Sequence, residues 1–156
     1  MSEATRAAID DIIEAFCSGD HARLADRYDD ELDWLLHAPA SVLPSAGVRR
    51  GKNAVLAGLL DLYRDFRIAS YKVPLIMVDG DRAAIISDLE MVERASGRVI
   101  TTHVASFQRF RDGKMIEYRG FWGRYDVTAG RQGDDLDVWP SGSPPTSPAM
   151  PRSYHD

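Results

Sequence analysis

Residues 68–125 read IASYKVPLIMVDGDRAAIISDLEMVERASGRVITTHVASFQRFRDGKMIEYRGFWGRY, and this stretch decides the fold. It divides into four segments rich in β-branched and aromatic residues, which favour strands: Ile68–Val78, Arg82–Arg94, Arg98–Phe110 and Met115–Tyr125. Three turns that each contain glycine separate them: Asp79-Gly80-Asp81, Ser96-Gly97 and Asp112-Gly113. Because glycine supplies the positive φ that tight hairpins need, the stretch predicts an antiparallel meander of four long strands.

The chain before the meander has a helical period. Apolar residues recur every three or four positions in residues 4–18 and again in Asn53–Phe66, which predicts two amphipathic helices, the second with Asn53 as its N-cap. Between them, Gly19 can end the first helix and Asp20 can cap a short second one.

A first strand is expected over Leu32–Ala38, where Pro39 ends it, and a loop over residues 39–50. Helices followed by a run of strands predict an α+β domain, with three N-terminal helices packed on a curved, mainly antiparallel sheet.

The composition of the chain limits its class. With 156 residues, one domain is expected, over residues 1–128, followed by a Gly/Pro/Ser-rich tail over 129–156. We expect the tail to pack on the domain or on a partner subunit through Trp139 and Met150. A net charge of −5 argues against nucleic acid as a partner. The single cysteine excludes an internal disulfide, and neither a signal peptide nor a membrane-spanning run is visible, so we expect a cytoplasmic protein with no membrane partner.

Three short stretches carry a resemblance to a known family. They are Asp33-Trp34-Leu35-Leu36-His37-Ala38-Pro39, Ala46-Gly47-Val48-Arg49-Arg50-Gly51 and the hairpin from Phe110 to Arg119. In this order and spacing, over residues 4–127, the chain resembles the SnoaL-like, ketosteroid isomerase-related family of the nuclear transport factor 2-like superfamily. The resemblance implies a cone around an apolar pocket for a small hydrophobic molecule, and an exposed sheet face that serves as a homodimer interface.

The same resemblance implies that the usual catalytic groups of the family are missing. The positions of the isomerase tyrosine, base and aspartate fall at Ile12, at Ala38 or Leu36, and at Ser106. The acid that SnoaL-type cyclases and limonene epoxide hydrolases carry on the last strand falls at Gly120. Steroid isomerisation by the usual mechanism is therefore not expected.

The remaining acid–base candidates are His103, Asp88 and Glu90. Histidine titrates near neutrality, and two close carboxylates in a dry pocket can divide into an acid and a base. The alternative is that Asp88 and Glu90 line the solvent face of their strand and that His103 lies in a dimer interface. Catalysis requires at least one of the three to point into the cone.

Aromatic and apolar residues give the prediction of a ligand. On elements expected to line the cone lie Trp34, Leu36, Tyr63, Tyr118 and Trp122, which favour a flat hydrophobic or aromatic metabolite. No metal site and no cofactor are predicted. Two functions stay open: proton transfer (isomerisation, cyclisation or dehydration), or a non-catalytic module for ligand binding or dimeric assembly.

Overall fold

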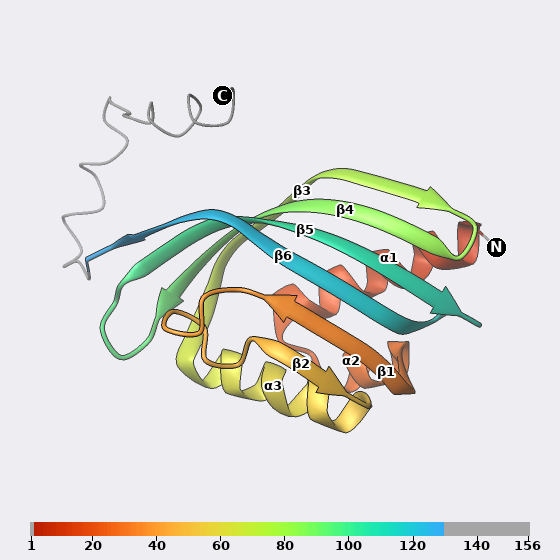
Figure 1. The fold of residues 1–156 in the computed structure, drawn as a ribbon, viewed down its shortest axis with the longest axis horizontal. Coiled ribbons are helices and arrows are strands. Elements are labelled where there is room, and N and C mark those ends of the chain that lie inside the picture. Colours follow the sequence, from red (N-terminus) through yellow and green to blue (C-terminus); the bar gives the residue numbers. More distant parts are fainter. Residues whose placement is uncertain (1, 130–156) are drawn as a thin grey trace.

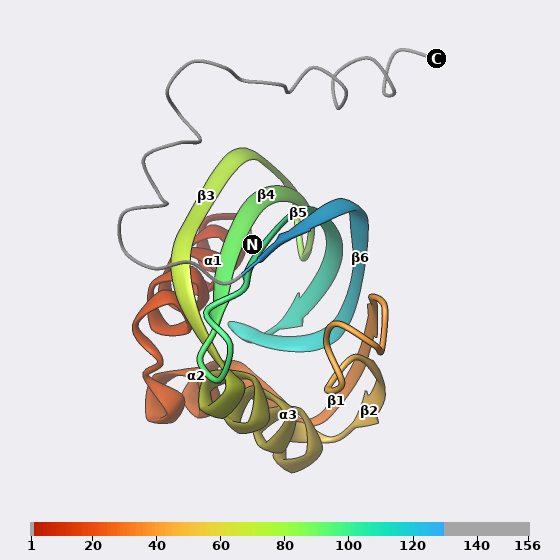
Figure 2. The ribbon, with the colours of Figure 1, turned by 90° about the vertical axis from the view of Figure 1, so that its left-hand side faces the viewer.

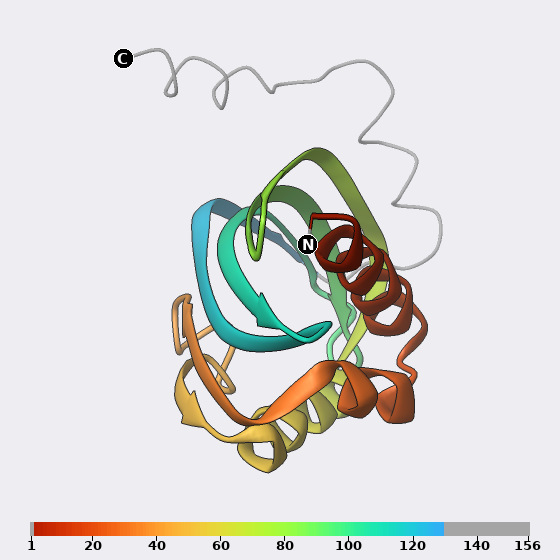
Figure 3. The same ribbon diagram turned by 90° about the vertical axis from the view of Figure 1, so that its right-hand side faces the viewer.

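The computed structural model describes residues 2–129, which form three helices and one six-stranded sheet (Figure 1). The elements are α1 (Ser2–Ser18), α2 (His21–Arg27), β1 (Tyr28–His37), β2 (Gly47–Arg50), α3 (Lys52–Asp65), β3 (Phe66–Asp79), β4 (Arg82–Glu93), β5 (Val99–Arg111) and β6 (Lys114–Thr128). The sheet, in the order β2-β1-β6-β5-β4-β3, curves strongly, and the helices close its open side (Figures 2 and 3). The predicted α+β cone is confirmed.

The β3–β6 meander forms because its turns allow it. Gly80, Gly97 and Gly113 have positive φ, as expected, and Asp112 joins them at φ 54°. The first strand, β1, pairs with β6 of this meander, and the two strands run parallel with Trp34 beside Tyr118. The sequence did not predict this parallel pairing. Parallel pairing is possible because a long connection, from β2 through α3 to β5, lies between the two strands.

Two local expectations were wrong. Residues 47–50 are not loop but strand β2, which pairs with β1 through Val48 and Leu35; four residues with one apolar side chain are too few to show a period. The third helix begins at Lys52, with Gly51 and not Asn53 at its N-cap. By contrast, the start of α2 is as expected, since the Asp20 side chain accepts a hydrogen bond from the Arg23 N–H.

Two side chains, Leu43 and Arg49, hold the loop between β1 and β2 in place. Leu43 in this loop is only 1% exposed and packs on Leu62 and Phe66. The Arg49 guanidinium donates from Nε to the Ser45 carbonyl (3.2 Å) and from Nη1 to the Ala54 carbonyl of α3 (3.1 Å). It therefore links the loop to the helix.

Gly58 makes room for this link. A methyl group at position 58 would lie 2.6 Å from Arg49 Nε, closer than any ordinary contact. The glycine is thus kept inside a helix, where it costs about 1 kcal/mol relative to alanine, because the guanidinium lies against it.

The last strand, β6, ends at Thr128. Trp139 and Met150, which we expect to anchor the tail, lie outside the described residues, so that expectation stays a prediction. Within residues 2–129, no helix has the length and apolar character to span a bilayer.

We predict that Gly58→Ala destabilises the domain by about 1–3 kcal/mol, because the methyl group displaces Arg49 from two carbonyls. Urea unfolding monitored by circular dichroism measures the change. In an Arg49→Ala background the same substitution should be neutral or stabilising by up to about 1 kcal/mol, as alanine is the better helix former. An equal loss in both backgrounds would show that the Arg49 contact is not the reason for the glycine.

Candidate functional site

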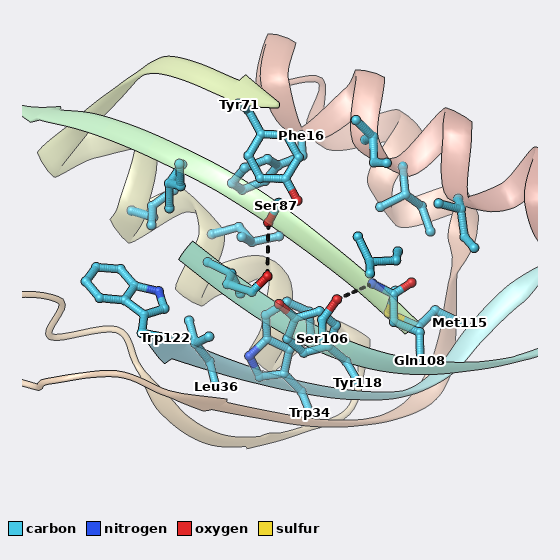
Figure 4. A pocket seen from close by; sticks show the side chains of 18 of the residues that line it. Phe16, Trp34, Leu36, Tyr71, Ser87, Ser106, Gln108, Met115, Tyr118 and Trp122 are labelled. Atoms are coloured by element: carbon cyan, nitrogen blue, oxygen red, sulfur yellow. Dashed lines mark hydrogen bonds between the residues drawn. The ribbon is translucent and has the colours of Figure 1, made fainter. Parts of the chain in front are cut away.

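A cavity of about 100 Å³ lies inside the cone (Figure 4). Its walls come from α1, α3, the Leu43 loop and every strand except β2. Most of the lining is aliphatic or aromatic, and the polar side chains are neutral: Tyr28, Tyr71, Ser87, Ser106, Gln108 and Tyr118, with the indoles of Trp34 and Trp122. No carboxylate, imidazole, amine or thiol of residues 2–129 is part of the lining.

Trp34 and Tyr118 form an aromatic stack in the cavity wall. Their strands pair in register, and the ring centroids are 3.9 Å apart with 14° between the planes. Tyr118 also folds over Gly120, two residues along the same face of β6: a methyl group at position 120 would lie 2.5 Å from the Tyr118 hydroxyl oxygen. Gly120 is therefore the reason that Tyr118 can lie along its own strand.

The position of this hydroxyl is informative. The family resemblance puts a catalytic acid at position 120, and here a tyrosine hydroxyl fills the space beside that backbone. An ionised carboxylate accepts hydrogen bonds and protons, whereas a neutral phenol chiefly donates. The wall beside position 120 therefore presents a hydrogen-bond donor where the resemblance implies an acid–base carboxyl group.

The other polar groups pair with one another (Figure 4). Gln108 Nε2 donates to Ser106 Oγ (3.2 Å), and Ser87 Oγ donates to the Val104 carbonyl over a long 3.5 Å. Tyr71 shares a hydrogen bond with Ser87.

The hydroxyls of Tyr28 and Tyr118 behave differently, since neither makes a hydrogen bond to any other described residue. Burial is the largest cause that raises the pKa of both tyrosines far above the usual value near 10, and the neighbouring tyrosines add to it. Both hydroxyls therefore stay neutral and available to donate.

Four of the five predicted ligand-binding residues line the cavity: Trp34, Leu36, Tyr118 and Trp122. Tyr63 does not, which corrects its predicted place. Its hydroxyl donates to the Phe16 carbonyl of α1 (2.8 Å), and its ring packs on Phe16, so it joins helices together.

Four polar lining residues were not predicted from the sequence: Tyr28, Tyr71, Ser87 and Gln108. Alternation could have found two of them, since Ser87 shares a strand face with Leu89, and Gln108 with Ser106. Tyr28 gave no such signal, because it follows a helix directly as the first residue of β1.

The structure places the three acid–base candidates outside the cone. Ser87, Leu89 and Met91 face inward from β4, so the pleat turns Asp88 and Glu90 outward. His103 lies beside Asp88 on β5, with its Nδ1 2.6 Å from Asp88 Oδ1 and with 43% and 46% of the two side chains exposed. The condition set for catalysis by these residues in the cone is not met.

The described residues, 2–129, do not indicate a metal site. Nowhere in residues 2–129 do three or more His, Cys, Asp or Glu side chains gather as a metal site would require.

Comparison with known proteins agrees with the geometry. The model of the SnoaL-like domain matches residues 9–118. The chain belongs to the SnoaL-like domain family. A search of curated proteins finds no significant match.

Solved structures with the same architecture include two described as enzymes. A provisionally assigned isomerase from Rhodopseudomonas palustris is 25% identical (TM-score 0.69, covering 74% of this chain and 88% of its own). An NTF2-like protein from Burkholderia xenovorans is 19% identical (TM-score 0.69; 79% and 92% covered). An LEH-like epoxide hydrolase from M. tuberculosis is 13% identical (TM-score 0.66; 78% and 84% covered). At 19% and 13% identity, the last two share the fold and carry no functional argument.

The buried tyrosines of this SnoaL-like domain predict a loss of stability at high pH. In the unfolded chain tyrosines ionise near pH 10, whereas burial keeps Tyr28 and Tyr118 protonated in the folded state. Their stabilising contribution is therefore complete below about pH 10 and falls above it, by up to about 1.4 kcal/mol per pH unit for each tyrosine.

Tyr118→Phe should flatten this decline, because phenylalanine cannot ionise in either state. Urea unfolding at pH 9 and pH 11 measures the difference, with the exposed Tyr125→Phe as the matched control. A decline as steep in Tyr118→Phe as in the unmodified protein would contradict the burial of this hydroxyl.

Proposed function

We propose that the cone binds one small, uncharged, apolar or aromatic molecule that carries a hydrogen-bond acceptor, and that it does so without catalysing a reaction. The observation that carries this proposal is the lining: it is apolar, it holds no charged side chain of residues 2–129, and two of its hydroxyls have no acceptor among those residues.

The size of the cavity favours a one-ring molecule. An apolar protein cavity of about 150 Å³ holds benzene. At about 100 Å³, this cavity is of that order and well below the volume of typical drug-sized pockets, about 300–1,000 Å³.

The charge of the ligand follows from the same walls. Moving an ionised group into an apolar cavity without a counter-charge is very costly, so a carboxylate or an ammonium ion is disfavoured. The Tyr28 and Tyr118 hydroxyls can donate to a carbonyl or ether oxygen, and Trp34 and Trp122 bring two further donors. A ligand without an acceptor would leave these donors unpaired in the cavity, at a cost of about 1–3 kcal/mol, so a ligand oxygen is favoured.

The lining formed by residues 2–129 does not support acid–base catalysis. Isomerisation or dehydration needs a group that removes a proton from the substrate within hydrogen-bond reach. Tyr118 could polarise a carbonyl, but its raised pKa makes it a poor base, and His103, Asp88 and Glu90 lie on the other side of the sheet. The enzyme names of two structural relatives therefore describe those proteins and do not assign a reaction to this chain.

We predict that the protein binds acetophenone more tightly than isopropylbenzene, which has the same outline but no acceptor. Tyr118→Phe should lower the affinity for acetophenone about fivefold, the equivalent of one hydrogen bond of about 1 kcal/mol. The affinity for isopropylbenzene should change by less than about twofold. Quenching of tryptophan fluorescence, checked by calorimetry, measures both.

Two comparisons make this result specific. Tyr63→Phe is the matched control, because its hydroxyl is bound to the backbone of α1, and Tyr28→Phe tests the second free hydroxyl. Benzoate, the charged analogue, should bind far more weakly. Equal affinity for acetophenone and isopropylbenzene in the unmodified protein would contradict the role of the hydroxyls, and binding of neither would contradict the pocket itself.

We further predict that the protein does not accelerate the exchange of the methyl protons of acetophenone with D₂O, because no base in the lining formed by residues 2–129 can remove them. Proton NMR of acetophenone with and without the protein measures the rate. Acceleration that Tyr118→Phe abolishes would overturn the non-catalytic proposal in favour of proton transfer.

A further inference from the structure

One polar side chain of the cavity lining differs in its chemistry from the rest. Gln108, on β5, carries a carbonyl oxygen, which accepts hydrogen bonds and cannot donate them. The other polar side chains of the described lining end in hydroxyl or indole groups, all of which can donate. We propose that this oxygen receives an O–H or N–H group of the ligand, so that the bound molecule is an aromatic compound with both an acceptor and a donor. This inference rests on the function proposed above and specifies its ligand.

One hydrogen bond determines how the Gln108 carboxamide is turned. Its Nε2 donates over 3.2 Å to the Oγ of Ser106, which lies two residues away on the same face of β5. The carbonyl oxygen of Gln108 consequently points away from Ser106 (Figure 4). No residue in the range 2–129 donates a hydrogen bond to this oxygen. The oxygen is therefore free to accept one from a bound molecule.

The free oxygen of Gln108 borders open space. Among residues 2–129, the only fully buried side-chain nitrogen or oxygen atom that lacks a hydrogen-bond partner is Nδ1 of His21. The Gln108 oxygen also lacks a partner, so it is not enclosed by packed atoms. Because Gln108 faces inward from β5, as Ser106 does, the space that it borders is the cavity.

The acceptor of Gln108 and the donor of Tyr118 lie close together. The two residues are paired across β5 and β6, and the next inward-facing pair is Ser106 with Gly120. The Gln108 amide reaches Ser106, and the Tyr118 hydroxyl lies over Gly120, so both groups turn towards the same row of the sheet (Figure 4). A ligand that uses both therefore carries its acceptor and its donor on neighbouring parts of the ring and not at opposite ends.

Binding of four one-ring ketones tests this inference. The unmodified protein should bind 3-hydroxyacetophenone about fivefold more tightly than acetophenone, because one further hydrogen bond forms. The methyl ether, 3-methoxyacetophenone, cannot donate and should show no such gain. 4-Hydroxyacetophenone should gain less than the 3-isomer, because its hydroxyl group lies at the far end of the ring from the ketone. Calorimetric titration measures the four dissociation constants.

Two variants assign the gain to Gln108. Gln108→Met keeps the length of the side chain but removes its polar atoms, so it should abolish the gain from the ligand hydroxyl and change the affinity for acetophenone by less than about twofold. Tyr118→Phe should lower the affinities for acetophenone and 3-hydroxyacetophenone by a similar factor, about fivefold, and keep their ratio. Tyr63→Phe is the matched control and should preserve both affinities, because its hydroxyl is bound to the Phe16 carbonyl.

The possible outcomes separate this inference from the proposed function. Equal binding of acetophenone and 3-hydroxyacetophenone by the unmodified protein, or a gain that survives in Gln108→Met, would overturn the donor site at Gln108 and leave the binding function standing. Tighter binding of 4-hydroxyacetophenone than of the 3-isomer would overturn the placement of donor and acceptor on one side of the ring. Binding of none of the four ketones would overturn both proposals.

Discussion

The two-residue alternation of a pleated strand is the constraint on which the structure of this domain depends. On β4 it sends Ser87, Leu89 and Met91 into the cone and Asp88 and Glu90 to the outside. One strand thus supplies part of an apolar cavity and part of a charged outer face. The inward and outward sets of side chains cannot exchange places without a shift of register by one residue, and such a shift would bury two carboxylates.

The chemistry of the cavity follows from a second local rule, the need of Tyr118 for a glycine at position 120. A tyrosine on a strand normally stands away from the sheet. Here it lies along β6, stacked on Trp34, and brings its hydroxyl beside the backbone of Gly120, where the family resemblance implies an acid. The described lining therefore holds hydrogen-bond donors and no charged base, and this is the ground for proposing binding without catalysis.

The sequence was informative wherever a local pattern sufficed. The glycine turns gave the meander, Asp20 gave the start of α2, and Trp34, Leu36, Tyr118 and Trp122 were found from the elements that carry them. It failed where the outcome depends on contacts distant in the chain. Gly51 begins α3 without a side-chain cap, since its N–H donates to the Leu32 carbonyl, and Tyr63 turns from the cavity to the Phe16 carbonyl. The parallel pairing of β1 with β6 has no signature in either strand alone.

Membership of the SnoaL-like family determines less about function than about architecture. A cone can be kept while its contents change, because the strands and helices that build it are also held by packing at buried positions that do not line the cavity, such as Leu24, Leu32 and Val55. The polar positions that face inward are free to differ as long as each group remains neutral or paired. Gly120 and Tyr118 satisfy that condition, because they place a neutral phenol in the wall without any change in the backbone topology, and the proposed binding function is thus compatible with a fold that enzymes share.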